Sequence, residues 1–330
     1  MTETTQCPTC GETVPAGAAW CEACGADLNA EPPVACVSCG AFDITEDGYC
    51  GTCGHRQPGP RDRVETAVGR AVGVSDKGLR HHHNEDAVAL GELIDGAVLV
   101  VCDGVSSTAG SAEASEAAAL AAVASLTTTL VAGADDAAVA AALEDATMAA
   151  QDAAGATADG VSEAERAAAR QHGPPSSTFL AAVAVERTDG LALGVAWLGD
   201  SRAYWIDDDG AELLTTDHEI NGSLVRWLGA DSGQVPPELF GRTVTGPGRL
   251  LLCTDGLWRY ADPPGELHAL VRRLTEEGGV DDAELARKLT AHAIDSGGHD
   301  NISVAIWSRE PKGPVDEGPP DDEGVESSNE

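Results

Sequence analysis

Four Cys-x-x-Cys pairs lie within the first 53 residues and limit what this segment can fold into. They contain eight of the ten cysteines: Cys7/Cys10, Cys21/Cys24, Cys36/Cys39 and Cys50/Cys53. Ten residues separate the two pairs of each half, so the segment is an internal repeat. A glycine follows the second cysteine of every pair and lets backbone amides fold back toward the thiolates. Because about 25 residues cannot bury a sufficient apolar core, each half needs another source of folding energy.

Two kinds of cross-link fit these cysteines. Four thiolates at this spacing form a tetrahedral zinc site, whereas a disulfide framework would require an oxidising compartment. The segment Met1–Gln6 is polar and carries no secretion signal, so we favour zinc. We expect two structural Zn²⁺, one held by Cys7, Cys10, Cys21 and Cys24 and the other by Cys36, Cys39, Cys50 and Cys53. The segment resembles a tandem zinc ribbon, a module with nucleic-acid-binding, protein-binding or architectural roles.

Acidic residues dominate the chain. There are 55 Asp and Glu against 20 Lys and Arg, which gives a formal net charge of −35. This charge disfavours contact with nucleic acid and with anionic lipid. No Lys or Arg occurs before residue 56, so protein–protein contact is the expected role of the ribbons. The longest uncharged run, Ala117–Ala134, is too weakly apolar to span a membrane, and we expect a cytoplasmic protein.

Composition also indicates where the parts of the chain begin and end. We expect a tandem zinc ribbon over residues 1–56 and a Pro- and Gly-containing linker over 57–66. A folded domain is expected over residues 67–309. Residues 310–330 are rich in Pro, Gly, Asp and Glu and are predicted to form a disordered acidic tail.

Within residues 67–309 the pattern predicts both strands and helices. The alanine-rich stretch from Ser111 to about Ala154 predicts two helices, the second capped by Asp135 or Asp136. A further amphipathic helix is expected over Asp282–Ile294, and a polar loop over 156–175. Apolar runs predict strands over 67–74, 98–102, 178–185, 191–198, 203–206, 249–253 and 302–307. This order favours an α+β layered fold with a central β-sandwich.

Carboxylates stand at the ends of several of these strands. Asp103 follows the run 98–102, Asp200 and Asp255 follow two others, and Asp300 precedes the last one. A single Asp at such a point is most often a turn residue or a helix cap. If the strands gather side by side, however, the carboxylates meet at one end of the sheets and can hold two divalent cations that clamp a phosphate and activate a water. Oxygen ligands favour Mg²⁺ or Mn²⁺ over zinc.

Seven short stretches, in order along the chain, resemble those of the metal-dependent protein phosphatases of the bacterial type 2C serine/threonine family. They are Asn84-Glu85-Asp86-Ala87, Val101-Cys102-Asp103-Gly104, Ser176-Ser177-Thr178, Leu198-Gly199-Asp200-Ser201-Arg202, Thr216-Asp217-His218, Cys253-Thr254-Asp255-Gly256-Leu257-Trp258 and Asp300-Asn301-Ile302-Ser303. The resemblance covers about residues 67 to 309. It implies a four-layer α-β-β-α sandwich with a binuclear Mn/Mg centre at one end, and hydrolysis of phosphoserine and phosphothreonine on proteins.

The resemblance also implies which residues hold the two cations. Asp103 would bridge both, and the carbonyl of Gly104 would bind one of them. Asp255 and Asp300 would hold the other. A water bridging the cations would attack phosphorus directly, without a phosphoenzyme.

Three further acidic residues acquire roles in the same way. Glu85 and Asp86 would orient waters bound to the cations. Asp200 matches the acid that, with Asp255, forms a weaker third metal site in bacterial members. The resemblance therefore implies two or three Mn²⁺/Mg²⁺ ions.

The chain departs from the family pattern at two places. The family has an arginine five residues before the second acid of the Glu-Asp pair, whereas here His81 is in that register and Arg80 precedes it. A one-residue bulge would make Arg80 the anchor of the substrate phosphate. In addition, Val105 stands where eukaryotic members carry a histidine that acts as general acid, so a water or another side chain must protonate the leaving group.

Other residues whose side chains could bind a metal or take part in catalysis are more simply explained by structural roles. His81, His82 and His83 cannot all converge on a metal because successive side chains alternate in direction, so a solvated loop at the substrate edge is expected. Cys102 and Cys253 fall within strand runs, where a thiol most often packs in the core.

We therefore expect a protein phosphatase that acts on phosphorylated proteins and opposes a bacterial Ser/Thr kinase, with the ribbons as a recruitment or regulatory module. The alternative is a non-catalytic, phosphatase-like regulatory protein that works through its ribbons. The complete set of acids at positions 103, 255 and 300 argues against that alternative. A nucleic-acid adaptor is disfavoured by the charge.

Overall fold

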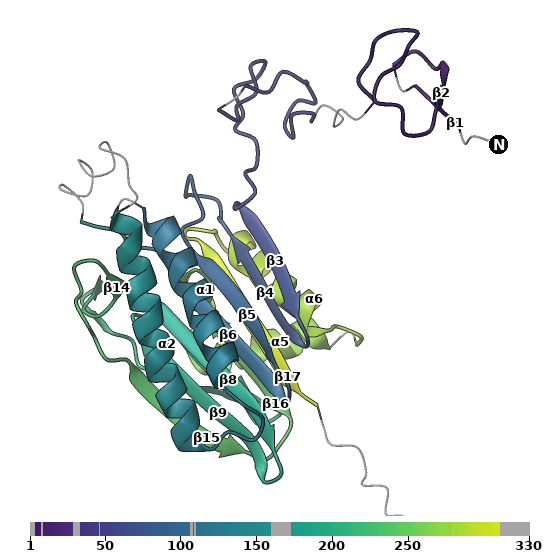
Figure 1. Cartoon of the computed structure of the whole chain (residues 1–330). Coiled ribbons are helices and arrows are strands. Elements are labelled where there is room, and N and C mark those ends of the chain that lie inside the picture. The colour runs from purple at the N-terminus through teal and green to yellow at the C-terminus, as the bar shows by residue number, and fades with distance from the viewer. Residues whose placement is uncertain are drawn as a thin grey trace, which may run out of the picture. The chain divides into compact units, whose positions relative to one another are not determined.

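The computed structural model describes residues 4–7, 9–28, 34–45, 47–105, 108, 110–159, 173–276 and 278–310. The chain divides into two units, residues 1–59 and residues 60–330 (Figure 1). The predicted acidic tail from residue 311 onward, and residues 160–172 of the predicted polar loop, lie outside the described residues.

The first unit has little regular structure, as expected for a segment with few large apolar residues. Its strands β1 (Thr4–Gln6) and β2 (Thr13–Pro15) pair antiparallel. A small buried group of Cys7, Val14 and Cys21 forms what core there is in the first half.

The second unit is built on two antiparallel sheets. The six-stranded sheet has the order β11 (Ala211–Leu213), β10 (Arg202–Ile206), β16 (Gly248–Cys253), β17 (Ile302–Arg309), β4 (Ala71–Asp76), β3 (Arg63–Val68). The five-stranded sheet has the order β15 (Glu238–Val244), β9 (Gly190–Leu198), β8 (Phe179–Arg187), β6 (Gly96–Cys102), β5 (Ala87–Leu93). Two short pairs join β12 (Glu219–Ile220) to β13 (Ser223–Leu224) and β14 (Leu228–Gly229) to β7 (Ser176–Ser177).

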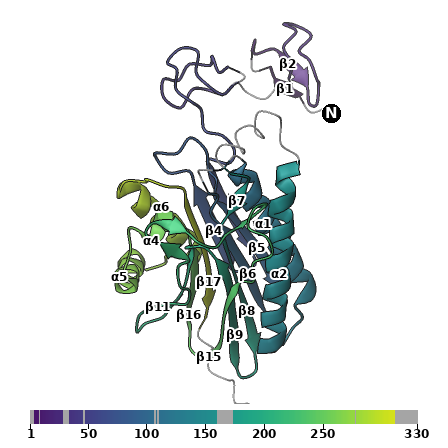
Figure 2. The same cartoon turned by 90° about the vertical axis from the view of Figure 1, so that its left-hand side faces the viewer.

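Helices cover the outer face of each sheet, which gives four layers (Figure 2). The long helices α1 (Ser111–Thr129) and α2 (Asp136–Ala156) pack on the five-stranded sheet, and a short 3₁₀ turn, η1 (Thr157–Asp159), follows α2. The other sheet carries α4 (Asp255–Trp258), α5 (Pro264–Thr275) and α6 (Asp282–Asp295). The predicted four-layer α-β-β-α architecture is confirmed. In the described residues no helix is both long and apolar enough to cross a bilayer.

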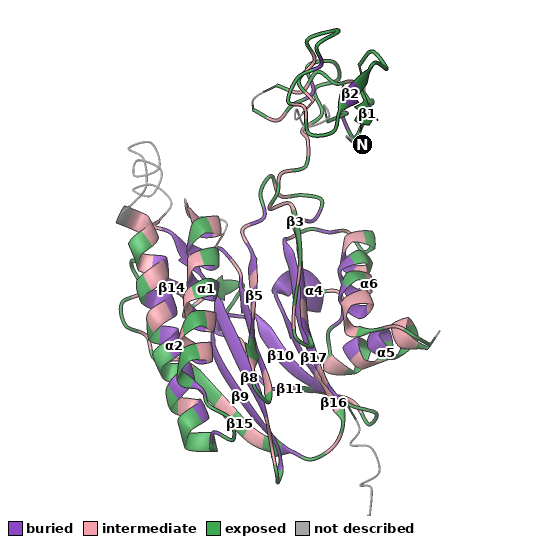
Figure 3. Cartoon of the chain, turned by 45° about the vertical axis from the view of Figure 1, so that its right-hand side comes forward, coloured by how far each residue is buried: buried purple, intermediate pink, exposed green. Residues whose placement is uncertain are grey.

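Successive side chains of β6 point to opposite faces of the sheet, and both faces are buried, so the strand is apolar at every position. Val98, Val100 and Cys102 face the helices, whereas Leu99 and Val101 face the opposite sheet. The inner strands of both sheets, such as β8, β9, β10 and β17, are accordingly buried along most of their length (Figure 3). Asp103, the first polar residue after this apolar run, directly follows the end of β6 and is half-buried.

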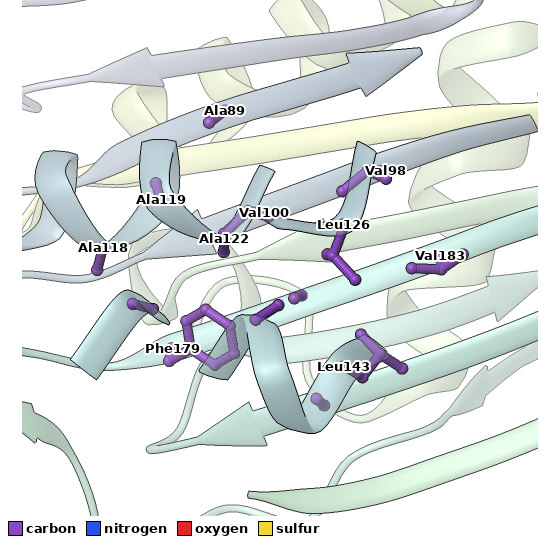
Figure 4. Packing of buried hydrophobic residues seen from close by; sticks show 14 of the residues in the cluster. Ala89, Val98, Val100, Ala118, Ala119, Ala122, Leu126, Leu143, Phe179 and Val183 are labelled. Atoms are coloured by element: carbon purple, nitrogen blue, oxygen red, sulfur yellow. The ribbon is translucent and has the colours of Figure 1, made fainter. Parts of the chain in front are cut away.

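The alanines of α1 and α2 let both helices lie close to the sheet. Ala118, Ala122 and Leu126 of α1 face Val98 and Val100 of β6 (Figure 4). The cap of α2 is also confirmed, because the side chain of Asp135 accepts a hydrogen bond of 2.8 Å from the amide of Ala138. Cys102 and Cys253 are fully buried in these cores, as predicted.

The structure corrects three expectations about secondary structure. The single strand expected over 67–74 is a hairpin of β3 and β4 that turns at Gly69, whose φ of 57° suits glycine. β3 begins at Arg63, within the predicted linker. Helix α5 and strand β15 were not predicted; β15 is an edge strand with mostly exposed or half-buried residues, so it lacks a clear apolar pattern.

Candidate metal centres

The eight ribbon cysteines form two groups of four free thiols. In each group all four Sγ atoms lie within 4.8 Å of one another. The Sγ atoms of Cys7 and Cys24 are 3.7 Å apart, and those of Cys39 and Cys50 are 3.6 Å apart. A tetrahedron with Zn–S bonds of about 2.3 Å has edges of about 3.8 Å. Both groups therefore fit one zinc ion each, and the eight cysteines are not paired as disulfides.

Local backbone geometry prepares the thiols for a metal. Each glycine after a pair has a left-handed φ, from 72° at Gly54 to 75° at Gly11. Burial by itself raises the pKa of Cys7, but hydrogen bonds from the Cys10 and Thr9 amides outweigh it and lower that pKa to about 6. Burial is likewise outweighed at Cys36, where hydrogen bonds lower the pKa to about 6. These two thiols are predisposed to the thiolate form that binds zinc.

The predicted strand-end acids meet in the second unit. One pocket is lined by Asp103, Gly104, Asp200, Asp255 and Asp300. The topology explains this, because β16 and β17 pair antiparallel with Cys253 opposite Val304, so the end of one strand and the start of the next share a sheet edge. Asp103 follows β6 of the facing sheet. The carboxylates thus come from both sheets.

Asp103 is held by the neighbouring strand. Its amide donates to Thr178 Oγ1 at 2.9 Å, and its carbonyl accepts from the Thr178 amide at 2.7 Å. The next residue must be glycine, since a Cβ at position 104 would lie 2.5 Å from the Glu85 carbonyl oxygen. The Gly104 amide donates to that same oxygen at 3.1 Å. This close approach joins the Asp103-Gly104 turn to the Glu85-Asp86 segment.

The Glu85-Asp86 segment is anchored from three sides. Glu85 Oε1 accepts a 2.6 Å hydrogen bond from Ser111 at the start of α1, and its amide donates to Asn301 Oδ1 at 2.8 Å. Asp86 is 4% exposed, and its Oδ2 accepts from Thr254 Oγ1 at 2.8 Å. Thr254 and Asn301 adjoin the pocket acids Asp255 and Asp300. One network therefore positions all four segments.

Electrostatics make this pocket unfavourable without a cation. Burial and the charges of Asp86, Asp255, Asp200 and Asp300 raise the pKa of Asp103 well above its ordinary value. Burial, followed by the charge of Asp255, raises the pKa of Asp200 to about 7. Such groups repel one another unless they are protonated or neutralised by a positive charge.

Two buried oxygens in this network lack hydrogen-bond partners, namely Asp86 Oδ1 and Asp255 Oδ1. An unpartnered buried carboxylate oxygen is costly, and a hard divalent cation would satisfy it. The donor set is composed of oxygens, so it fits Mg²⁺ or Mn²⁺. Among the described residues, only the cysteine groups bring three or more ligand atoms within 4.8 Å of one another, so the carboxylate oxygens are more widely spaced than the thiols.

The basic side chains and the three histidines differ in how close they lie to the pocket. Arg80 is exposed and does not line the pocket. His82 and His83 are exposed, and His81 places its Nε2 3.2 Å from Asp300 Oδ1. Arg259, which sequence analysis missed, lines the pocket and donates from Nε to Asp255 Oδ2 at 2.8 Å. The sequence could have indicated this contact, because Arg259 lies four residues after Asp255, a spacing that brings two side chains of a helix together.

The far wall of the pocket also went unpredicted. Leu224, Trp227 and Asp231 line it, together with Glu219. They belong to the segment containing β12, β13 and β14, which has no apolar periodicity. Val105 lines the pocket beside Gly104, as its position in the sequence suggests.

Comparisons with known proteins match a family to each unit of the chain. The family described as protein phosphatase 2C matches residues 79–290, and the family described as double zinc ribbon matches residues 7–54. A search of curated proteins found no match.

Solved structures share the fold of the second unit. The serine/threonine phosphatase PstP/Ppp from Mycobacterium tuberculosis is 25% identical with a TM-score of 0.52, and the match covers 72% of this chain and 97% of that one. The PstP catalytic domain in complex with two manganese ions is 24% identical with a TM-score of 0.54, covering 73% and 98%. Stp1 from Staphylococcus aureus is 21% identical with a TM-score of 0.56, covering 77% and 99%.

Proposed function

The chain belongs to the protein phosphatase 2C family, and we propose that it hydrolyses phosphoserine and phosphothreonine on proteins in a reaction that depends on Mn²⁺ or Mg²⁺. One observation carries this proposal. Carboxylates from the ends of separate strands converge on one pocket, and Oδ1 of one of them, Asp255, is buried without a hydrogen-bond partner.

Four residues would hold a binuclear centre in this pocket. They are Asp103, the carbonyl of Gly104, Asp255 and Asp300, all of which line it. Glu85 and Asp86, which hydrogen bonds join to Gly104 and Thr254, would orient waters bound to the cations. When bound, two such cations neutralise phosphate charge and lower the pKa of a bound water. The PstP structure with two manganese ions supports Mn²⁺ as one choice of cation.

The cysteines of the domain support hydrolysis by water and not by a thiol. Cys102 and Cys253 are fully buried. Burial, the largest contribution for each, raises the pKa of both thiols far above neutrality. A protonated, inaccessible thiol cannot attack phosphorus. Direct attack by water, without a phosphoenzyme, is therefore the proposed route.

We assign the ribbons a protein-binding role. Trp20, Val37 and Phe42 are 60%, 62% and 65% exposed, an unusual exposure for large apolar side chains. The same segment has no Lys or Arg before residue 56 and so lacks a surface for phosphate backbones. Phosphorylated proteins and an opposing Ser/Thr kinase are the partners we propose. Free thiols in two zinc-binding groups suit the reducing cytoplasm.

The proposal is tested by phosphate release from a phosphothreonine peptide in the presence and absence of Mn²⁺. We expect turnover that requires the cation and is lost in Asp255→Asn. Asp208→Asn is the matched control, because Asp208 is an exposed aspartate outside the pocket. Undetectable turnover by zinc-loaded protein that binds Mn²⁺ would instead favour a non-catalytic regulatory protein. Full activity of Asp255→Asn would contradict the proposed site.

A further inference from the structure

Arg259 lies between two acidic side chains of the pocket. Its Nε donates to Asp255 Oδ2 at 2.8 Å, and its terminal NH2 nitrogen is 3.9 Å from Asp200 Oδ2. The side chains of Asp200 and Asp255 are only 9% and 11% exposed, whereas that of Arg259 is 54% exposed. The guanidinium therefore reaches from the pocket opening to two buried carboxylates.

The surrounding structure holds this arginine in place. Arg259 directly follows α4, and its amide donates to the Asp255 carbonyl at 3.1 Å. Its guanidinium lies 5.2 Å from the ring centroid of Trp258. The indole of Trp258 in turn donates to the Asp200 carbonyl at 2.9 Å. One tryptophan thus positions both the arginine and the more distant of its two acidic neighbours.

This arrangement uses the two oxygens of Asp255 differently. Oδ2 accepts from Arg259, whereas Oδ1 is buried without a partner and is available to a cation of the binuclear centre. A third divalent cation held by Asp200 and Asp255 would have to occupy the space that the guanidinium of Arg259 fills. The guanidinium already supplies the positive charge that this cation would bring. Arginine stays protonated at every working pH, so its charge is permanent. Two positive charges at one place would repel each other.

We propose that Arg259 takes the place of a third divalent cation, so that the pocket holds two divalent cations and one guanidinium. The expected third metal site at Asp200 is then absent from this protein because the chain supplies its own cation there. The proposal rests on the binuclear centre proposed above, and it makes Arg259 a positioning residue for Asp255.

Metal stoichiometry tests the proposal independently of activity. Full-length protein is dialysed against increasing Mn²⁺, and Mn and Zn are counted in the same sample by mass spectrometry. The zinc content serves as an internal count of chains. We compare the wild type with Arg259→Ala, Arg259→Lys, and the double variant Arg259→Ala/Asp200→Asn. Arg242→Ala is the matched control, since it removes the same charge from an arginine that pairs with Glu212 outside the pocket.

We expect two Mn²⁺ in the wild type, in Arg259→Lys and in Arg242→Ala. Arg259→Ala should bind a third, weaker Mn²⁺, and the added Asp200→Asn change should remove it. Three Mn²⁺ in the wild type, or only two in Arg259→Ala, would overturn the role of Arg259 while leaving the binuclear centre intact. Wild-type protein that bound no Mn²⁺ would overturn the binuclear centre and this inference together.

Discussion

The hydroxyl of Thr254 donates a hydrogen bond of 2.8 Å to Asp86 Oδ2, joining two residues that are both buried and lie 168 positions apart. The same hydroxyl oxygen accepts from the Ser303 amide at 2.9 Å. Thr254 therefore connects the segment before β5, the end of β16 and the start of β17. The last two of these segments carry the pocket acids Asp255 and Asp300, and the first carries Asp86.

Thr254→Val should destabilise the second unit, because it removes the hydrogen bond to Asp86 while keeping the shape of the side chain. Asp86 Oδ1 already lacks a partner, so both oxygens would then be unpartnered. We expect the free energy of unfolding of the metal-free protein to fall by about 1–3 kcal/mol. Urea unfolding, monitored by tryptophan fluorescence, measures this loss. Thr254→Ser keeps the hydroxyl, and an equal loss in that variant would contradict the explanation.

Asn301→Ala should weaken Mn²⁺ binding, although we assign Asn301 no contact with the cation. Its side chain accepts from the Glu85 amide at 2.8 Å and donates to the carbonyls of Lys77 and His83 at 2.9 and 3.1 Å. Without these bonds the segment that carries Glu85 and Asp86 loses its position. Partners of this kind affect metal affinity by roughly 10–100-fold.

Titration calorimetry with Mn²⁺ measures this effect. Gln234→Ala is the control, because Gln234 is an exposed amide that does not line the pocket. Unchanged Mn²⁺ affinity in Asn301→Ala would show that the three hydrogen bonds do not organise the site.

Metal-free protein should become less stable as the pH rises from about 4 to about 7. Burial and the charge of Asp255 raise the pKa of Asp200 to about 7, so the folded state retains a proton that the unfolded chain releases near its ordinary pKa. The folded state thus binds more protons in this window, and the free energy of unfolding falls as the pH increases. Each such group contributes at most about 1.4 kcal/mol per pH unit.

Urea unfolding between pH 4 and pH 7 in metal-free buffer checks this slope. Asp200→Asn should flatten it, whereas Asp208→Asn should not. Added Mn²⁺ should restore stability at pH 8, by about 2.7 kcal/mol at a concentration of 100 times Kd. A slope that is identical in the wild type and in Asp200→Asn would exclude Asp200 as its source.

Cys50→Ser should reduce the zinc content from two ions to one without unfolding the phosphatase unit. Cys50 is 1% exposed and belongs to the second thiol group, whereas residues 60–330 form a separate unit with its own cores. We expect activity on a small phosphopeptide to remain within about twofold of the wild type, since every residue that lines the pocket belongs to the other unit.

Zinc analysis and peptide turnover on the same preparation measure both effects. Ser38→Ala, a change at an exposed serine of the same ribbon, is the control and should keep both zinc ions. Loss of activity in Cys50→Ser together with intact zinc binding in Ser38→Ala would show that the ribbons regulate catalysis.

Much of this protein follows from local patterns in the sequence. The spacing of the cysteine pairs and their glycines determines the two thiol groups, because each pair lies within one short turn. The alanine-rich stretch determines two helices, and the apolar run before Asp103 determines a buried strand with a carboxylate at its end. In each of these cases the residues that interact are close in the chain or repeat with a fixed period.

Only the tertiary structure decided which distant groups share the pocket. Arg80 stands beside the matching motif yet is exposed, whereas Arg259 reaches Asp200 across 59 positions. Edge strand β15 and the wall around Trp227 likewise depend on contacts with other segments, since neither has a regular apolar pattern. Side-chain charges act through space at a few ångströms, and the folding of two sheets against each other determines which charges come that close.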